Sequence, residues 1–168
     1  SLPESAYPSQ LTSHTPKKIK LQFTRGELTA IDDTQGTAVA LIQQLQDMAK
    51  SYAIGIDIHV GDTIIGIKGR VGFEAAAPMI IIKAHHLLEK HTQSKWQQFQ
   101  KEQQASFYGM QLHEGNFLDP VMRDIEAFLE SSQANVTGEV FLTLKPYQFE
   151  LEGIQSPYDL MNADFGSY

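Results

Sequence analysis

The apolar residues of this chain change their spacing several times, and that change is the strongest constraint on its fold. Apolar and polar residues alternate over residues 18–23 and again over residues 139–144, as in a strand with one buried face. Over residues 37–52 the apolar positions instead follow the i, i+3, i+4, i+7 spacing of a helix. Strand-like segments come in pairs, with helices between the pairs. This order predicts an α+β domain with a mixed, largely antiparallel sheet, several hairpins and about four helices.

Short turns mark three hairpins. The first has its turn at residues 24–26. In the second, Gly61 and Asp62 are expected to form the turn between strands over residues 53–59 and 63–67. The third hairpin crosses Lys145-Pro146-Tyr147, between the strand-like segments EVFLTL and QFELEG.

Proline and capping residues set the expected starts of three further helices. Pro78 fits the first turn of a helix that continues to His91, and the apolar residues 79–82 near its start should be buried. A capping box from Ser94 to Gln97 opens a helix outside the core. The last helix is expected to begin with Asp119 as N-cap and Pro120 as first residue, and to end near Ala134.

Composition excludes several classes of function. The net charge is −7, and no block of basic residues exceeds Lys17-Lys18, so neither nucleic acid nor an anionic membrane surface is an expected partner. The absence of cysteine rules out disulfides and thiolate chemistry and favours a cytoplasmic protein. No apolar run reaches the roughly 18–20 residues of a membrane span. We expect one domain over residues 17–168, after a linker remnant rich in Ser, Thr and Pro over residues 1–16.

The common catalytic signatures are missing from the sequence. It has no GxSxG, GxxxxGK[ST] or HExxH motif, and its six histidines lack zinc-site spacing, so no catalytic residue and no metal site is expected. The loop over residues 61–74 differs, because glycines let a ligand approach the backbone while Asp62, Lys68, Arg70 and Glu74 bring charges of both signs. A zwitterionic small molecule would suit this loop. Alternatively, the glycines serve turns and a bulge, and Lys68 and Arg70 are solvated.

Several blocks, in a fixed order, resemble one enzyme family. The blocks are the IDI strand at Ile56, the GIKGR run at Gly66, the pair Phe73-Glu74, the KAHHLLE helix, Tyr108-Gly109 and the segment EGIQSPYDL. Through these blocks the chain, from about residue 18 to residue 168, resembles the carboxy-terminal synthetase domain of argininosuccinate synthases. The resemblance implies a fragment without the preceding nucleotide-binding domain and without the terminal multimerisation helix.

This resemblance implies part of a ligase of arginine biosynthesis and the urea cycle. Argininosuccinate synthases use ATP, with Mg²⁺, to adenylate the ureido oxygen of citrulline, and release AMP and pyrophosphate when the aspartate amine attacks. The ATP and aspartate sites would lie in the missing domain, so we expect no cofactor on this chain and no activity from it alone. Family members are homotetramers assembled largely through this domain, so self-association is also expected.

The resemblance places one wall of the citrulline site on this chain. The family has a tyrosine at the position of Phe73, which keeps the ring but lacks the hydroxyl donor. The loop appears one residue longer than in the family, and Asp62 is the nearest carboxylate to replace the family's glutamate as the acceptor of the citrulline α-ammonium. Lys68 and Arg70 complete the expected substrate-binding set. The departures at Phe73 and at the glutamate support an alternative, a non-catalytic oligomerisation or interaction domain.

Overall fold

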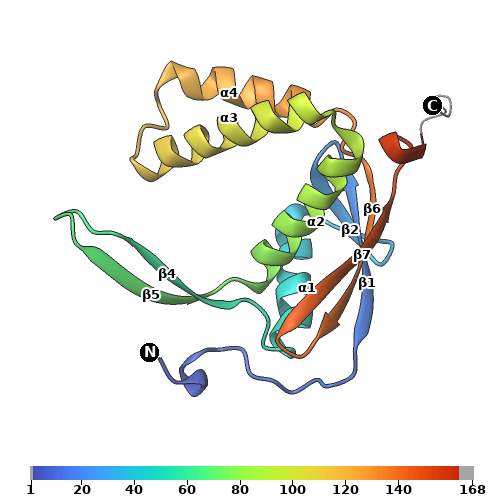
Figure 1. The fold of residues 1–168 in the computed structure, drawn as a ribbon. Coiled ribbons are helices and arrows are strands. Elements are labelled where there is room, and N and C mark those ends of the chain that lie inside the picture. The colour runs from blue at the N-terminus through green and yellow to red at the C-terminus, as the bar shows by residue number, and fades with distance from the viewer. Residues whose placement is uncertain (1, 163–168) are drawn as a thin grey trace.

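A computed structural model of the chain describes residues 2–162. The domain is built around a five-stranded sheet. The strands lie in the order β3-β2-β1-β6-β7, so the first and last hairpins of the chain join through β1 and β6 (Figure 1). All neighbouring strands are antiparallel, which confirms the α+β class and the largely antiparallel sheet. The strands are β1 (Lys17–Thr24), β2 (Glu27–Ile31), β3 (Thr34–Gln35), β6 (Gly138–Lys145) and β7 (Gln148–Gln155).

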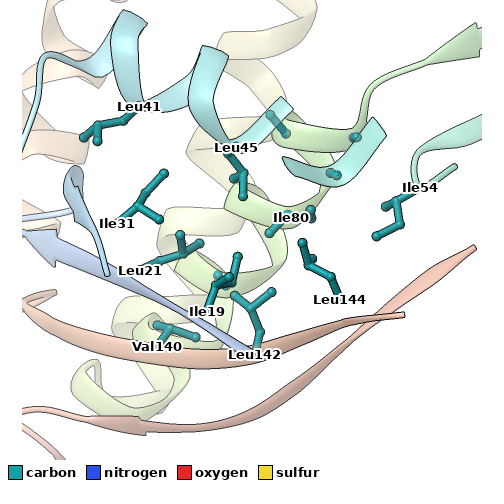
Figure 2. Packing of buried hydrophobic residues seen from close by; sticks show 14 of the residues in the cluster. Ile19, Leu21, Ile31, Leu41, Leu45, Ile54, Ile80, Val140, Leu142 and Leu144 are labelled. Carbon is teal, nitrogen blue, oxygen red and sulfur yellow. The ribbon is translucent and has the colours of Figure 1, made fainter. Parts of the chain in front are cut away.

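Two helices, α1 (Ala38–Lys50) and α2 (Ala76–Thr92), pack on the sheet and enclose the core. Figure 2 shows Leu41 and Leu45 of α1 and Ile80 of α2 in the same cluster as the inward-facing side chains of the strands. Each fully buried aliphatic side chain stabilises the fold by roughly 1.5–3 kcal/mol relative to exposure. The strands contribute Ile19, Leu21, Ile31, Val140, Leu142 and Leu144 to this cluster.

The apolar stretch near the start of α2 is only partly buried, so the expectation for residues 79–82 is wrong in part. Ile80 is fully enclosed, whereas the side chain of Ile82 is 66% exposed. Successive residues of a helix turn by about 100°, so Ile82 points away from the side on which Ile80 lies. A helix that packs against a sheet buries one stripe of its surface, and four consecutive apolar residues cannot all lie in that stripe.

Helices α3 (Lys95–His113) and α4 (Pro120–Ser132) form an antiparallel pair that extends away from the sheet (Figure 1). Both predicted starts are confirmed. Ser94 and Gln97 make the reciprocal hydrogen bonds of a capping box, and the Val121 amide donates to the Asp119 carboxylate at 2.9 Å. No residue of α3 is buried, which confirms a helix outside the core. Within residues 2–162, no helix combines the length and apolar character needed to cross a membrane.

Strands β4 (Ile56–Asp62) and β5 (Lys68–Glu74) form a separate hairpin that projects from the body of the domain (Figure 1). The expected second hairpin is thus confirmed, but the turn at residues 61–62 and the strand over residues 63–67 are wrong. Residues 63–67 form the turn, in which Gly66 has a φ of +80° and the Thr63 amide donates to the Ile67 carbonyl at 2.8 Å. The isoleucines of this segment have strand propensity, but they are exposed at the tip with nothing to pack against.

Residues 2–16, the N-terminal segment, run along the domain to the start of β1. Hydrogen bonds to the two residues that follow α1 hold this segment in place. The Thr12 and Ser13 amides donate to the Ser51 carbonyl at 2.8 and 2.9 Å, and the Tyr52 hydroxyl donates to the Thr15 carbonyl at 2.8 Å. One short 3₁₀ helix, Glu4–Ala6, lies in this segment, and another, Leu160–Asn162, ends the described chain.

Candidate functional site

The β4–β5 hairpin carries all four residues that the sequence singles out for substrate binding. Its register places Asp62 opposite Lys68, and Arg70 two residues further along β5. Side chains alternate between the two faces along a strand, so Asp62, Lys68 and Arg70 share one face of the hairpin. Phe73, which lies opposite Asp57, is on the other face. The structure therefore groups the three charged candidates and separates the aromatic one from them.

Asp62 and Lys68 form an ion pair beside the hairpin turn. Their side chains are 69% and 66% exposed, so water screens the pair and it contributes at most about 1 kcal/mol to stability. The carboxylate that the sequence predicts as the acceptor of a substrate ammonium is thus paired with Lys68, the residue opposite it. A ligand that binds there through its ammonium group would replace Lys68 as the partner of Asp62.

Phe73 lies at the base of the hairpin, five register positions from the pair of Asp62 with Lys68. At about 3.3 Å per residue, this separation is roughly 17 Å along the strands. The two candidates that replace the family's tyrosine and glutamate therefore lie near opposite ends of the hairpin and on opposite faces. Contact of either one with citrulline stays a prediction.

Glu74, the last residue of β5, has a partner that no local sequence pattern indicates. Its carboxylate accepts hydrogen bonds from the Ser9 amide, at 3.0 Å, and from the Ser9 hydroxyl. Ser9 is buried, and 65 residues separate the two partners along the chain. Sequence reasoning singled out Glu74 by its charge and missed Ser9. This contact fixes the N-terminal segment against the base of the hairpin.

Two hollows lie where the N-terminal segment meets the hairpin. Of the residues that line them, sequence reasoning singled out Arg70 for ligand binding and no other. The first has a volume of about 500 Å³ and the second of about 570 Å³. No residue spacing connects the start of the chain to the hairpin, so only the folded structure shows them. The first hollow is lined by Leu2, Glu4, Tyr7, Ala53, Gly55, Ile56, Asp57, Ile58 and Tyr147, and the second by Leu2, Tyr7, Ile58, Arg70, Val71 and Gly72.

A buried ionic cluster connects α2 with the α3–α4 pair. Glu89 has a side chain that is 2% exposed, and its carboxylate accepts hydrogen bonds from the Lys101 ammonium and from the Gln133 amide, the latter at 2.8 Å. Burial raises the pKa of Glu89, but His85, Lys101 and Gln133 outweigh burial and hold that pKa below its ordinary value. Burial lowers the pKa of His85, whose Nε2 lies 2.8 Å from Oε1 of Gln133. These contacts are internal, so the cluster anchors helices to one another.

Comparison with known protein families identifies the domain. Residues 4–168 match the family described as arginosuccinate synthase C-terminal domain. The chain belongs to this family. The resemblance inferred from the ordered sequence blocks is thereby confirmed.

Individual relatives of the chain carry the name argininosuccinate synthase. The chain is 34% identical to that of Xylella fastidiosa over 158 residues, which are 94% of this chain and 38% of the relative. It is 34% identical to that of Xanthomonas campestris pv. campestris over 166 residues, 99% of this chain and 40% of the relative. It is 33% identical to that of Dehalococcoides mccartyi over 161 residues, 96% and 40% of the two chains. The chain thus spans about two fifths of the length of these curated relatives.

Proposed function

We propose that this chain is the citrulline-side part of an argininosuccinate synthase, a cytoplasmic ligase that joins citrulline to aspartate at the expense of ATP in arginine biosynthesis. The observation that carries the proposal is the family match over residues 4–168. The complete activity would belong to a protein that also contains the part of the relatives that this chain does not cover. The chain by itself is expected to be inactive.

In this proposal the β4–β5 hairpin binds and orients citrulline and performs no chemical step. The Asp62 carboxylate would accept the α-ammonium in a charge-assisted hydrogen bond, and Lys68, released from Asp62, would join Arg70 near the α-carboxylate. All three side chains lie on one face of the hairpin, which suits a ligand with both charges. Phe73 lies on the other face and offers only a ring for packing. Positioning of this kind lowers the barrier by holding reactants in a productive geometry.

The described residues do not fit a site for ATP and Mg²⁺. In residues 2–162 no three His, Cys, Asp or Glu side chains are grouped so that they could hold a metal ion. The sequence also lacks the glycine-rich phosphate loop of P-loop nucleotide sites. We therefore assign ATP, Mg²⁺ and aspartate to the remainder of a complete synthase, and no step through them to this chain.

The substitution Asp62→Ala in the full-length protein tests the role of the hairpin. Loss of a charge-assisted hydrogen bond costs about 1.5–3 kcal/mol, so the KM for citrulline should rise about 10- to 150-fold. The KM values for ATP and aspartate should stay the same. Asp124→Ala, at an exposed position of α4, is the matched control. An unchanged KM for citrulline in the Asp62 variant would show that the carboxylate has no substrate role.

A second candidate function, a non-catalytic oligomerisation domain, is favoured by an apolar stripe on α3. Phe99, Phe107 and Met110 are 48%, 45% and 56% exposed and line a hollow of about 570 Å³. Exposed apolar surface of this kind commonly marks a protein interface. If the stripe mediates the self-association expected for a homotetramer, Phe99→Ser with Phe107→Ser should lower the mass measured by light scattering. Val39→Ser, at an exposed apolar position of α1, should leave the mass unchanged.

A further inference from the structure

The two hollows beside the N-terminal segment carry charges of opposite sign. The first is lined by Glu4 and Asp57 and by no basic residue. The second is lined by Arg70 and by no acidic residue. A ligand that enters the first therefore meets negative charge, and one that enters the second meets positive charge.

The hollows adjoin one another, because Leu2, Tyr7 and Ile58 line both. Tyr7 reaches across the base of the hairpin to β5, where a Cβ added to Gly72 would lie 2.7 Å from its hydroxyl oxygen. The missing side chain at Gly72 thus leaves room for the tyrosine. The shared residues give the combined groove an apolar middle between its charged ends.

The acidic end of the groove is held in place by Tyr147. Its hydroxyl donates a hydrogen bond to Glu4 Oε1 at 3.1 Å, which also raises the pKa of Tyr147. The Tyr147 backbone is fixed in turn, because its amide donates to the Tyr52 carbonyl at 2.8 Å. A carboxylate can accept several hydrogen bonds, so Glu4 can still receive an ammonium group while Tyr147 is bound.

The basic end of the groove is an arginine without an acidic partner. Within residues 2–162, no carboxylate lies within ion-pair distance of the Arg70 guanidinium, whereas Lys68 on the same face is paired with Asp62. A guanidinium presents its N–H groups in a planar fork that matches the two oxygens of a carboxylate. Arg70 can therefore bind a carboxylate without first losing an ion pair.

The two hollows reach different positions along the hairpin. The acidic hollow begins at Gly55 and Ile56, whereas Arg70 lies opposite Val60. Four residues of strand span roughly 13 Å, and Leu2, Tyr7 and Ile58 line the part of the groove that both hollows share. We propose that this groove binds an extended small zwitterion, with its ammonium at Glu4, its carboxylate at Arg70 and an apolar chain across Leu2, Tyr7 and Ile58.

Binding of three related probes to the 168-residue chain tests this proposal. We suggest calorimetric titration with 8-aminooctanoate, which has both charged ends, and with octylamine and octanoate, which each have one. The zwitterion should bind at least tenfold more tightly than either singly charged probe. Arg70→Gln should reduce the affinity for 8-aminooctanoate to that for octylamine, and Glu4→Gln should reduce it to that for octanoate.

Two variants remove similar charges outside the groove and serve as controls. Lys90→Gln and Glu27→Gln, at exposed positions of α2 and β2, should leave the affinity for 8-aminooctanoate within twofold of the unchanged chain. Absence of saturable binding, equal affinity for all three probes, or equal loss in the control variants would each overturn the proposal. The titrations involve neither ATP nor citrulline, so their failure would leave the proposed ligase function standing, and the converse holds as well.

Discussion

Glu89 is a carboxylate almost wholly removed from water, and its effect on the fold depends on the groups that surround it. Lys101 supplies the opposite charge from α3, and Gln133 supplies a hydrogen bond from the residue after α4. A buried ion pair can contribute little net stability, yet removal of one partner leaves the other unpaired in a medium of low dielectric constant. The attachment of the α3–α4 pair to α2 should therefore be sensitive to this residue.

We predict that Glu89→Ala destabilises the domain by about 2–4 kcal/mol, because Lys101 and Gln133 lose their common partner. Urea unfolding at neutral pH measures the change. Glu130→Ala removes a carboxylate from an exposed part of α4 and should change stability by no more than about 0.5 kcal/mol. Equal effects of the two substitutions would show that the buried cluster does not anchor the helices.

Among the elements, the projecting hairpin depends on one tight passage at its base. Gly55 has a φ of +90°, and a Cβ added there would lie 2.4 Å from the Ala76 backbone nitrogen. Its carbonyl also accepts a hydrogen bond from the Ala75 amide at 2.9 Å. The start of α2 and the start of β4 therefore approach each other at a point where only glycine fits.

We expect Gly55→Ala to destabilise the domain by about 2–4 kcal/mol, through backbone strain and the clash with α2. Gly109→Ala is the matched control, because Gly109 lies in α3 and an added Cβ would meet nothing within 4 Å. Alanine is the better helix former, so this control should stabilise by roughly 0.5–1 kcal/mol. Thermal unfolding measures the melting temperature of both variants. A shift in the same direction for both would contradict this explanation of Gly55.

Elements set by local chemistry could be predicted from the sequence. The capping residues Ser94 and Asp119 placed the starts of α3 and α4 correctly, because a cap acts within one turn of helix. The β4–β5 turn was misplaced, because residues 63–67 combine glycine with isoleucines that have strand propensity. Where turn and strand signals coincide, spacing alone does not decide the register.

For the whole molecule, the sequence blocks identified the family correctly, whereas the arrangement of the site needed the structure. The contact of Ser9 with Glu74 joins distant parts of the chain, and nothing in either neighbourhood predicts it. Likewise, Phe73 and Asp62 lie on different faces of the hairpin because of its register. That register depends on the turn, which sequence reasoning misplaced. Long-range contacts and side-chain direction were therefore the parts beyond sequence reasoning.

We propose that this chain forms part of an argininosuccinate synthase. The most direct test measures pyrophosphate release by the full-length protein, with ATP and Mg²⁺ present and with citrulline or aspartate omitted in turn. We expect release that requires both amino acids, together with formation of argininosuccinate. A correctly folded full-length protein that releases no pyrophosphate with both amino acids present, or releases it without regard to citrulline, would contradict the claim.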